Sequence, residues 1–299
     1  MKIHSDVAQA LAAGRPVVAL ESTIISHGLP RPSNLEVAQQ IEQTVRDNGA
    51  VPATIAMLAG EVHVGLDHAA LLEIANRDDV VKASIRDLAI VAARGGYGAT
   101  TVAATAHLAK QAGISVFATG GLGGVHRGAS TTWDESADLV ALARLPITIV
   151  CAGVKSILDI PATLERLETL SVGVVGYQTT HFPGFYLSDS GFTIEHQVNS
   201  PAEIAAVTKQ RQALGTNSSA LVVANPLPTD KQMDPTQHDQ LLRGGLAAAE
   251  KAGIVGKDAT PFLLEYFHRE SKGESLRANI DIILSNAALA AQIAVAERA

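Results

Sequence analysis

The sequence contains one cysteine, Cys151, among 299 residues. A disulfide framework and a zinc site built from cysteines are therefore excluded. Acidic residues outnumber basic ones, and the net charge of −7 argues against a dedicated nucleic-acid-binding protein. The N-terminus lacks the apolar region of a signal peptide, and no apolar run approaches the roughly 20 residues of a membrane span. We therefore expect a soluble cytoplasmic protein that makes no membrane contact.

Hydrophobic residues make up 47% of the chain, and aromatic residues only 4%. Most of the apolar residues are Ala, Val, Leu and Ile, which is typical of helices packed on a parallel sheet. No charge run or low-complexity linker divides the sequence. We therefore expect one domain over residues 1–299, with a three-layer α/β/α architecture around a central, mostly parallel mixed sheet.

Apolar runs and amphipathic stretches alternate along the chain and predict its strands and helices. The expected strands are 16–20, 51–58, 61–65, 80–84, 114–118, a run from 147, 172–177 and 220–224. The expected helices are 5–13, 33–47, one from 67, one ending at 94, 102–112, 134–143, one directly after Lys155, 201–214, 235–252, 258–271 and 275–297. Residues 95–101 are predicted to form a glycine-rich turn, and residues 180–199 a flap or an extra hairpin.

Lys155 follows the apolar run from Ile147 and precedes an amphipathic pattern, so we place it between a strand and a helix. Ligands of open α/β sheets bind at this carboxyl edge. The free N–H groups of a helix start would disfavour an ammonium and favour a neutral, nucleophilic amine. A surface lysine on a first helical turn would fit the same position.

Polar residues stand at the ends of most of the predicted strands. If the strands are parallel, these residues converge on one edge of the sheet. Each alone is explained as a cap or a loop contact, but two lysines and a glutamate together indicate a functional site. The residues are Glu21, Lys82, Thr119, Lys155, Gln178 and Asn225.

Asp134 and Asp138 are four residues apart and would share one face of the predicted helix 134–143. They are either helix-capping residues or the start of a site for a hard cation such as magnesium or manganese. The nearby His126 could be a metal ligand, an acid or a phosphate contact. Asn279 could direct its amide to the edge of a pyrimidine, since an amide both donates and accepts hydrogen bonds.

Several contiguous strings of residues resemble one known family. The resemblance runs from about residue 5 to residue 295, and it indicates the pseudouridine-5′-phosphate glycosidase family, also called the indigoidine synthase A-like family. The strings are ALESTIISHG at 19–28, PATIA at 52–56, GATTVA at 98–103, the glycine-rich stretch 117–128, CAGVKS at 151–156 and VANP at 223–226.

The resemblance implies reversible cleavage of pseudouridine 5′-phosphate to uracil and ribose 5-phosphate. Ribose and uracil are joined by a carbon–carbon bond, so the protonation of a linking oxygen that other glycosidases use is impossible. In this family Glu21 would protonate the ring oxygen of the ribose, and Lys155 would attack C1′. The base would leave after protonation at C5, and the remaining imine would be hydrolysed. A carboxylic acid and a neutral amine must therefore coexist in one site.

The resemblance assigns further roles to positions of this chain. Lys82 would contact the phosphate, Val102 the substrate, Asp134 a metal ion, and His126 and Asn279 would be a site histidine and a uracil contact. The segment Ser136, Ala137 and Asp138 would also contact the substrate. One manganese ion per subunit and a homotrimer are implied as well.

Two other functions remain open at this point. A class I aldolase-like lyase would also form a Schiff base on Lys155, with a sugar phosphate as its substrate. A non-catalytic ligand-binding protein of the same fold would form no covalent adduct.

Overall fold

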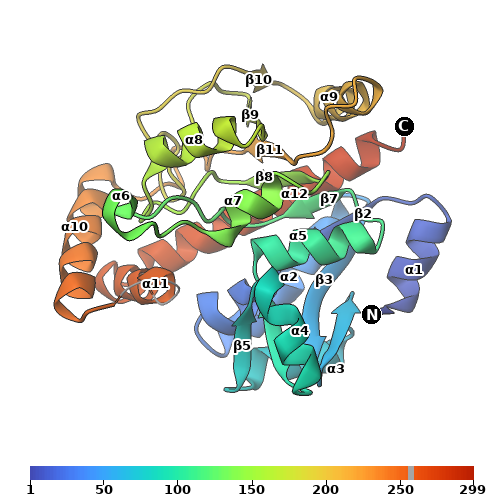
Figure 1. Ribbon diagram of the computed structural model, residues 1–299, viewed down its shortest axis with the longest axis horizontal. Helices are drawn as coiled ribbons and strands as arrows, with labels where there is room; N and C mark the ends of the chain where they lie inside the picture. Colours follow the sequence, from blue (N-terminus) through green and yellow to red (C-terminus); the bar gives the residue numbers. More distant parts are fainter. Residues whose placement is uncertain (255–258) are drawn as a thin grey trace.

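The computed structural model describes residues 1–254 and 259–299. In these residues eleven strands form one sheet, with helices on both of its faces (Figure 1). All paired strands are parallel except β3 with β4 and β3 with β6. The predicted three-layer architecture with a mostly parallel mixed sheet is confirmed. Along the sheet the order is β1 (Lys2–Ile3), β4 (Glu61–Val64), β3 (Val51–Leu58), β2 (Val17–Leu20), β7 (Val116–Ala118), β8 (Thr148–Cys151), β11 (Leu221–Ala224), β9 (Gly173–Tyr177) and β10 (Gln197–Val198).

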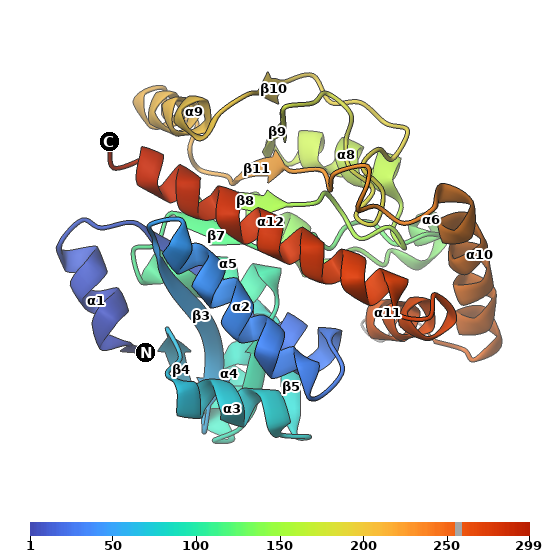
Figure 2. The same ribbon diagram turned by 180° about the vertical axis from the view of Figure 1, so that it is seen from behind.

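Successive residues of the central strands face opposite layers, as the strand period of two requires. Val18 and Val150 pack against α2 (Ser33–Asp47) and α12 (Glu274–Ala296), which lie side by side across one face (Figure 2). Phe117 and Ile149 belong to the core on the other face. That layer contains α1 (Ser5–Ala12), α5 (Val102–Gln111), α7 (Ala137–Leu142) and α8 (Ile160–Thr169).

The remaining helices extend these layers at their edges. The end of the chain forms three helices, as expected from its sequence, although residue 258, the predicted start of the second, lies outside the described residues. The helices at the edges are η1 (Ile24–Gly28, a π-helix), α3 (His68–Asn76), α4 (Ile85–Ala93), α6 (Ala129–Thr132), α9 (Pro201–Ala213), α10 (Pro235–Lys251) and α11 (Ala259–Glu270).

Helix α12 is the longest helix of the described residues. It is the one helix of the described residues that is long and apolar enough to cross a membrane, with a mean hydropathy of 1.4 over its most apolar window. However, 61% of that window is buried inside the fold, where Ile282, Ala287 and Ile293 pack against neighbouring elements. Packing in the core therefore accounts for its apolar composition.

The strand β3 divides the sheet in a way that creates the site. Its first half, to Thr54, pairs with β2, and its second half pairs with β6 (Tyr97–Thr100), which runs in the opposite direction. Strand β6 in turn pairs with β5 (Val80–Ala83). The carboxyl ends of β2 and β6 meet, and the hydroxyls of Ser22 and Thr100 each donate to the carbonyl of Ile55 at 2.7 Å. This buried seam joins the two parts of the sheet beneath one shared edge.

The strand β6 replaces most of the glycine-rich turn predicted at residues 95–101. A Cβ atom at Gly98 would lie 3.2 Å from the Cβ of Ala83 and 3.4 Å from that of Met57. Glycine therefore permits close strand packing here, a requirement that the sequence alone does not distinguish from that of a turn.

Two helices begin later than expected. Helix α7 starts at Ala137 with Ser136 as its N-cap, so Asp134 lies outside it and does not share a helix face with Asp138. Helix α8 starts at Ile160, where the Asp159 side chain caps it. Lys155 therefore lies in a loop, and the predicted influence of a helix start on its amine is wrong.

The segment 180–199 is anchored in the core rather than a free flap, and it ends in the short strand β10. A single antiparallel bridge joins His181 to Thr193. The side chains of Phe182, Phe185 and Tyr186 are buried in the main core, and the last two make an edge-to-face contact at 4.6 Å. These aromatic residues fix the loop against the rest of the molecule.

Candidate active site

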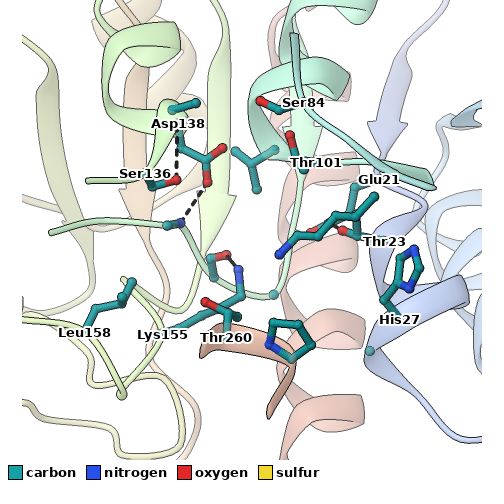
Figure 3. Close-up of a pocket in the computed structure, with 18 of the residues that line it drawn as sticks. Glu21, Thr23, His27, Ser84, Thr101, Ser136, Asp138, Lys155, Leu158 and Thr260 are labelled. Carbon is teal, nitrogen blue, oxygen red and sulfur yellow. Dashed lines mark hydrogen bonds between the residues drawn. The ribbon is translucent and has the colours of Figure 1, made fainter. Parts of the chain in front are cut away.

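A cavity of about 570 Å³ lies where the carboxyl ends of β2, β5, β6, β7 and β8 converge (Figure 3). The structure brings all ten residues predicted for the site to its walls, although it does not test the roles assigned to them. They are Glu21, Lys82, Val102, His126, Asp134, Ser136, Ala137, Asp138, Lys155 and Asn279. The other three strand-end residues, Thr119, Gln178 and Asn225, are not among those that line the cavity, and Gln178 donates instead to the carbonyl of Asn199.

Glu21 follows β2 and is buried in the wall of the cavity. Its two carboxyl oxygens accept hydrogen bonds from the hydroxyls of Thr23 and Thr119. Thr119 follows β7, so neighbouring strand ends supply the acid and one of its partners. A hydroxyl can donate or accept. This environment is therefore compatible with both the ionised and the protonated carboxyl.

Lys155 reaches the cavity from the loop after β8. Its Nζ donates to the carbonyl of Gly121 at 2.8 Å, and it makes no salt bridge with any of the described residues. A hydrogen bond from the amine to a neutral carbonyl is weaker than one to a carboxylate would be. In Figure 3, Glu21 and Thr23 lie on one side of the cavity, and Ser136 and Asp138 lie on the other.

The glycine-rich segment from Thr119 to Leu122 is fixed to the loop that contains Lys155. The main chain of Thr119 donates to Val150 at 3.0 Å, and that of Lys155 donates to Leu122 at 3.1 Å. A Cβ atom at Gly121 would lie 2.7 Å from the ring of Phe185. The glycine thus permits a close approach of main chain and aromatic ring.

Asp138 is bound by main-chain groups on both sides. Its Oδ1 accepts from the N–H of Ala103 and its Oδ2 from the N–H of Gly123, both at 2.9 Å. The sequence predicted a substrate contact at this position. The geometry shows in addition that the carboxylate ties the start of α5 to Gly123, which directly follows the glycine-rich segment.

His126 and Asp134 form a pair at the edge of the cavity. The His126 Nδ1 lies 3.7 Å from the Asp134 Oδ2. Burial lowers the pKa of His126, and the charges of Lys82 and Lys155 lower it further, although Asp134 opposes both effects. His126 is therefore predominantly neutral at neutral pH.

No group of three or more His, Cys, Asp or Glu side chains in the described ranges could hold a metal ion. The donor set at Asp134 consequently fits a hard cation that keeps most of its water ligands and takes one protein carboxylate. It does not fit a cation that needs a closed protein cage.

Other residues of the cavity were not identified from the sequence. Ser84 and Thr101 cap the starts of α4 and α5, and the Ser84-x-x-Asp87 capping box is a signal that could have located the first. His27 comes from η1, and burial and the Lys82 charge lower its pKa, while a hydrogen bond with the main chain of Val80 opposes them. Its position depends on how η1 packs beside β5, which no local pattern shows. Arg86, Phe185 and Thr260 also line the cavity.

Comparison with known proteins gives a family match over nearly the whole chain. The sequence model of the indigoidine synthase A like protein family matches residues 6–296. The chain is 63% identical over 294 residues to a pseudouridine-5′-phosphate glycosidase of Salinispora tropica, with 98% of this chain and 91% of that protein covered. It is 57% identical to another from Saccharopolyspora erythraea, with 98% and 96% covered.

Two solved structures share the fold. The prealnumycin C-glycosynthase AlnA, in complex with ribulose 5-phosphate, is 34% identical with a TM-score of 0.91, and 99% of this chain and 96% of that chain are covered. An indigoidine synthase A-like protein of Thermotoga maritima is 32% identical with a TM-score of 0.90, and 100% and 96% are covered.

Proposed function

Because the chain belongs to the indigoidine synthase A-like family, we propose that it catalyses the reversible cleavage of pseudouridine 5′-phosphate to uracil and ribose 5-phosphate. The observation that carries this proposal is that Glu21 and Lys155, from different strand ends, line one cavity. The names of the relatives and the sugar phosphate bound by AlnA support the same conclusion.

The first step needs an acid and a nucleophile together. Glu21 donates its proton to the ring oxygen of the ribose, the bond from this oxygen to C1′ breaks, and the Lys155 amine forms a bond to C1′. The hydroxyls of Thr23 and Thr119 remain partners of Glu21 before and after it loses the proton. The carbonyl of Gly121 holds the amine at the cavity without a competing carboxylate.

The second step breaks the carbon–carbon bond. The Lys155 nitrogen loses a proton after it bonds to C1′, and uracil takes up one proton at C5. The electrons of the bond between C1′ and C5 stay with uracil, the nitrogen lone pair forms a double bond to C1′, and the base leaves an imine between C1′ and Lys155. Water then adds to the imine, which releases ribose 5-phosphate and regenerates the free amine. Glu21 takes up a proton from solvent, which replaces the one that it gave to the sugar.

The cavity offers separate environments for the two ends of the substrate. Lys82 and Arg86 lie on its wall together with Ser84 and Thr101, which cap two helices. Cations beside helix N-termini favour a phosphate group. Asn279, at the start of α12, is suited to the donor and acceptor pattern of uracil.

We further propose one manganese ion per subunit, held by Asp134 with water ligands, with His126 beside it. When bound, such an ion supplies positive charge to oxygen atoms of the substrate. The homotrimer that the family resemblance implies, and the cytoplasmic location expected from the sequence pattern, are proposals of the same standing. The exposed Trp133, next to Asp134, is a side chain that such an assembly could cover.

The test is to incubate the protein with pseudouridine 5′-phosphate and to measure uracil by chromatography. In parallel, ribose 5-phosphate with borohydride should add a reduced sugar to Lys155, located by mass spectrometry. A trapped adduct without uracil release would indicate the aldolase-like alternative. If neither product forms, the proposed reaction is refuted and a ligand-binding role is favoured.

A further inference from the structure

A chain of buried amides lies directly beneath the cavity. Asn286 of α12 is 1% exposed, and its side chain is directed at the carboxyl ends of the strands. Its amide nitrogen donates to the carbonyl of Thr119 at 2.8 Å and lies 3.4 Å from that of Gly120. Its oxygen accepts from the amide of Asn225, at the end of β11, at 2.9 Å. Burying an amide between a helix and a sheet is unfavourable unless it is fully hydrogen-bonded.

The two carbonyls that Asn286 approaches belong to the one segment that contacts both proposed reacting groups. The hydroxyl of Thr119 donates to Glu21, and the carbonyl of Gly121 accepts from the Lys155 amine. Displacing this segment would therefore move the acid and the amine relative to one another.

Two other residues, Ala152 and Phe185, also hold this segment in place. The main chain of Ala152 donates to Gly120 at 2.9 Å, and the ring of Phe185 occupies the space beside Gly120 and Gly121. Asn286 supplies the contact on the side of the segment that faces α12. It does not line the cavity itself.

From this arrangement we infer that Asn286 is a positioning residue. It holds the segment from Thr119 to Gly121 so that the Glu21 carboxyl and the Lys155 amine face the same carbon and oxygen atoms of the sugar. The inference rests on the proposed function for its catalytic consequence. A displacement of about 1 Å in such a site lowers the rate on the order of a hundredfold, whereas substrate binding through the phosphate is unaffected.

The experiment uses two variants of Asn286 and one of Thr119. Asn286→Leu fills similar space without an amide. Asn286→Asp keeps the shape of the side chain but replaces the donor nitrogen with an oxygen. The aspartate variant provides the test if the leucine variant does not fold. Thr119→Val removes the hydroxyl that reaches Glu21. Thr54→Val is the matched control. The buried hydroxyl of Thr54 donates to the Glu42 carboxyl at 2.7 Å, and neither residue lines the cavity.

We expect both Asn286 variants to lower kcat on the order of a hundredfold with little change in KM. The double variant with Thr119→Val should lose less than the product of the two single effects, because both changes act on the same contact. Thr54→Val should reduce stability and leave kcat unchanged.

Two results would overturn the inference. One is an Asn286 variant that loses stability as Thr54→Val does but keeps its kcat. The other is a double variant whose losses multiply independently. If the wild-type protein releases no uracil, the proposed function fails separately. Crystal structures of the wild type and Asn286→Asp then decide the positioning role, which an unmoved Thr119–Gly121 segment and an unmoved Glu21 carboxyl would refute.

Discussion

Among the described residues that line the cavity, the carboxyl groups of Glu21 and Asp138 are buried, and the protein holds them in opposite ways. Glu21 accepts from two hydroxyls, whereas Asp138 accepts from two main-chain N–H groups at 2.9 Å. An N–H group can only donate, so each of these contacts needs a carboxyl oxygen of Asp138 as its acceptor. Hydroxyls can reverse their role, so the surroundings of Glu21 suit a group that gains and loses a proton. The difference separates a reacting acid from a fixed anion that shapes the site.

Lys155→Ala should have the largest effect on activity, because it removes the nucleophile that attacks C1′ when Glu21 protonates the ring oxygen. We expect no detectable uracil release and no borohydride-trapped sugar adduct. Circular dichroism and gel filtration should match the wild type, since the side chain makes one hydrogen bond to a carbonyl. Appreciable turnover in this variant would show that another group forms the adduct.

Glu21→Gln tests the acid directly, because glutamine keeps the size and can still pair with both hydroxyls. Loss of a general acid lowers kcat by roughly 10²- to 10⁴-fold. Binding of ribose 5-phosphate, measured by calorimetry, should change little. A variant with normal kcat would remove the distinction between the two carboxyl groups.

Asp134 is a third carboxylate and differs from both others, because its side chain is 31% exposed and faces His126. Chelator treatment should lower activity and manganese should restore it, because a bound divalent cation supplies positive charge to the substrate oxygens. Asp134→Asn should resist restoration at the same manganese concentration. Activity that is indifferent to both treatments would argue against a metal at this position.

Asp138→Asn should act on stability before chemistry. The amide keeps one acceptor, so one of the two main-chain N–H groups loses its partner, which destabilises a fold by about 1–3 kcal/mol. Urea unfolding followed by fluorescence would measure this. Glu135→Gln, which alters a contact with Arg166 nearer the surface, is the control and should change stability less. Equal effects would mean that the two N–H contacts of Asp138 are not structurally special.

His238 is a buried titratable group outside this pair of carboxyl groups, and its Nδ1 lies 3.7 Å from the Asp239 Oδ1. Neither ring nitrogen of His238 is hydrogen-bonded by the described residues, and its ring packs beside Tyr186 and Phe267. Burial lowers its pKa, Arg127 adds to this, and Asp239 opposes it. The folded protein therefore binds a proton less readily than the unfolded chain. The contribution of His238 to the free energy of unfolding is therefore full above the unfolded pKa of about 6.5. It declines as the pH falls below that value.

His238→Leu should reduce that decline and is the smallest effect. The contribution of one such group is at most about 1.4 kcal/mol per pH unit. Urea unfolding at pH 7.5 and pH 5.5 would show a smaller difference for the variant than for the wild type. Equal differences would mean that His238 is not protonated on unfolding in this range.

Local pattern was sufficient for most elements of this fold. The apolar run at 51–58 was predicted with the bounds that β3 shows, and the last three helices were predicted close to the bounds of α10, α11 and α12. Where prediction failed, the pattern was ambiguous. Gly98 allows a turn as readily as a tightly packed strand, and the boundary of α7 depends on Ser136 as its cap.

The sequence by itself determined most of the strands and helices and the group of polar residues that follow the strands, because periodicity and composition act over a few neighbouring residues. Only the tertiary structure decided which partner each of those residues meets. The bonds from Thr119 to Glu21 and from Asn286 to Thr119 cross 98 and 167 positions of the chain. Contacts of that separation depend on how β3 divides the sheet and how α12 crosses it, and no local pattern encodes them.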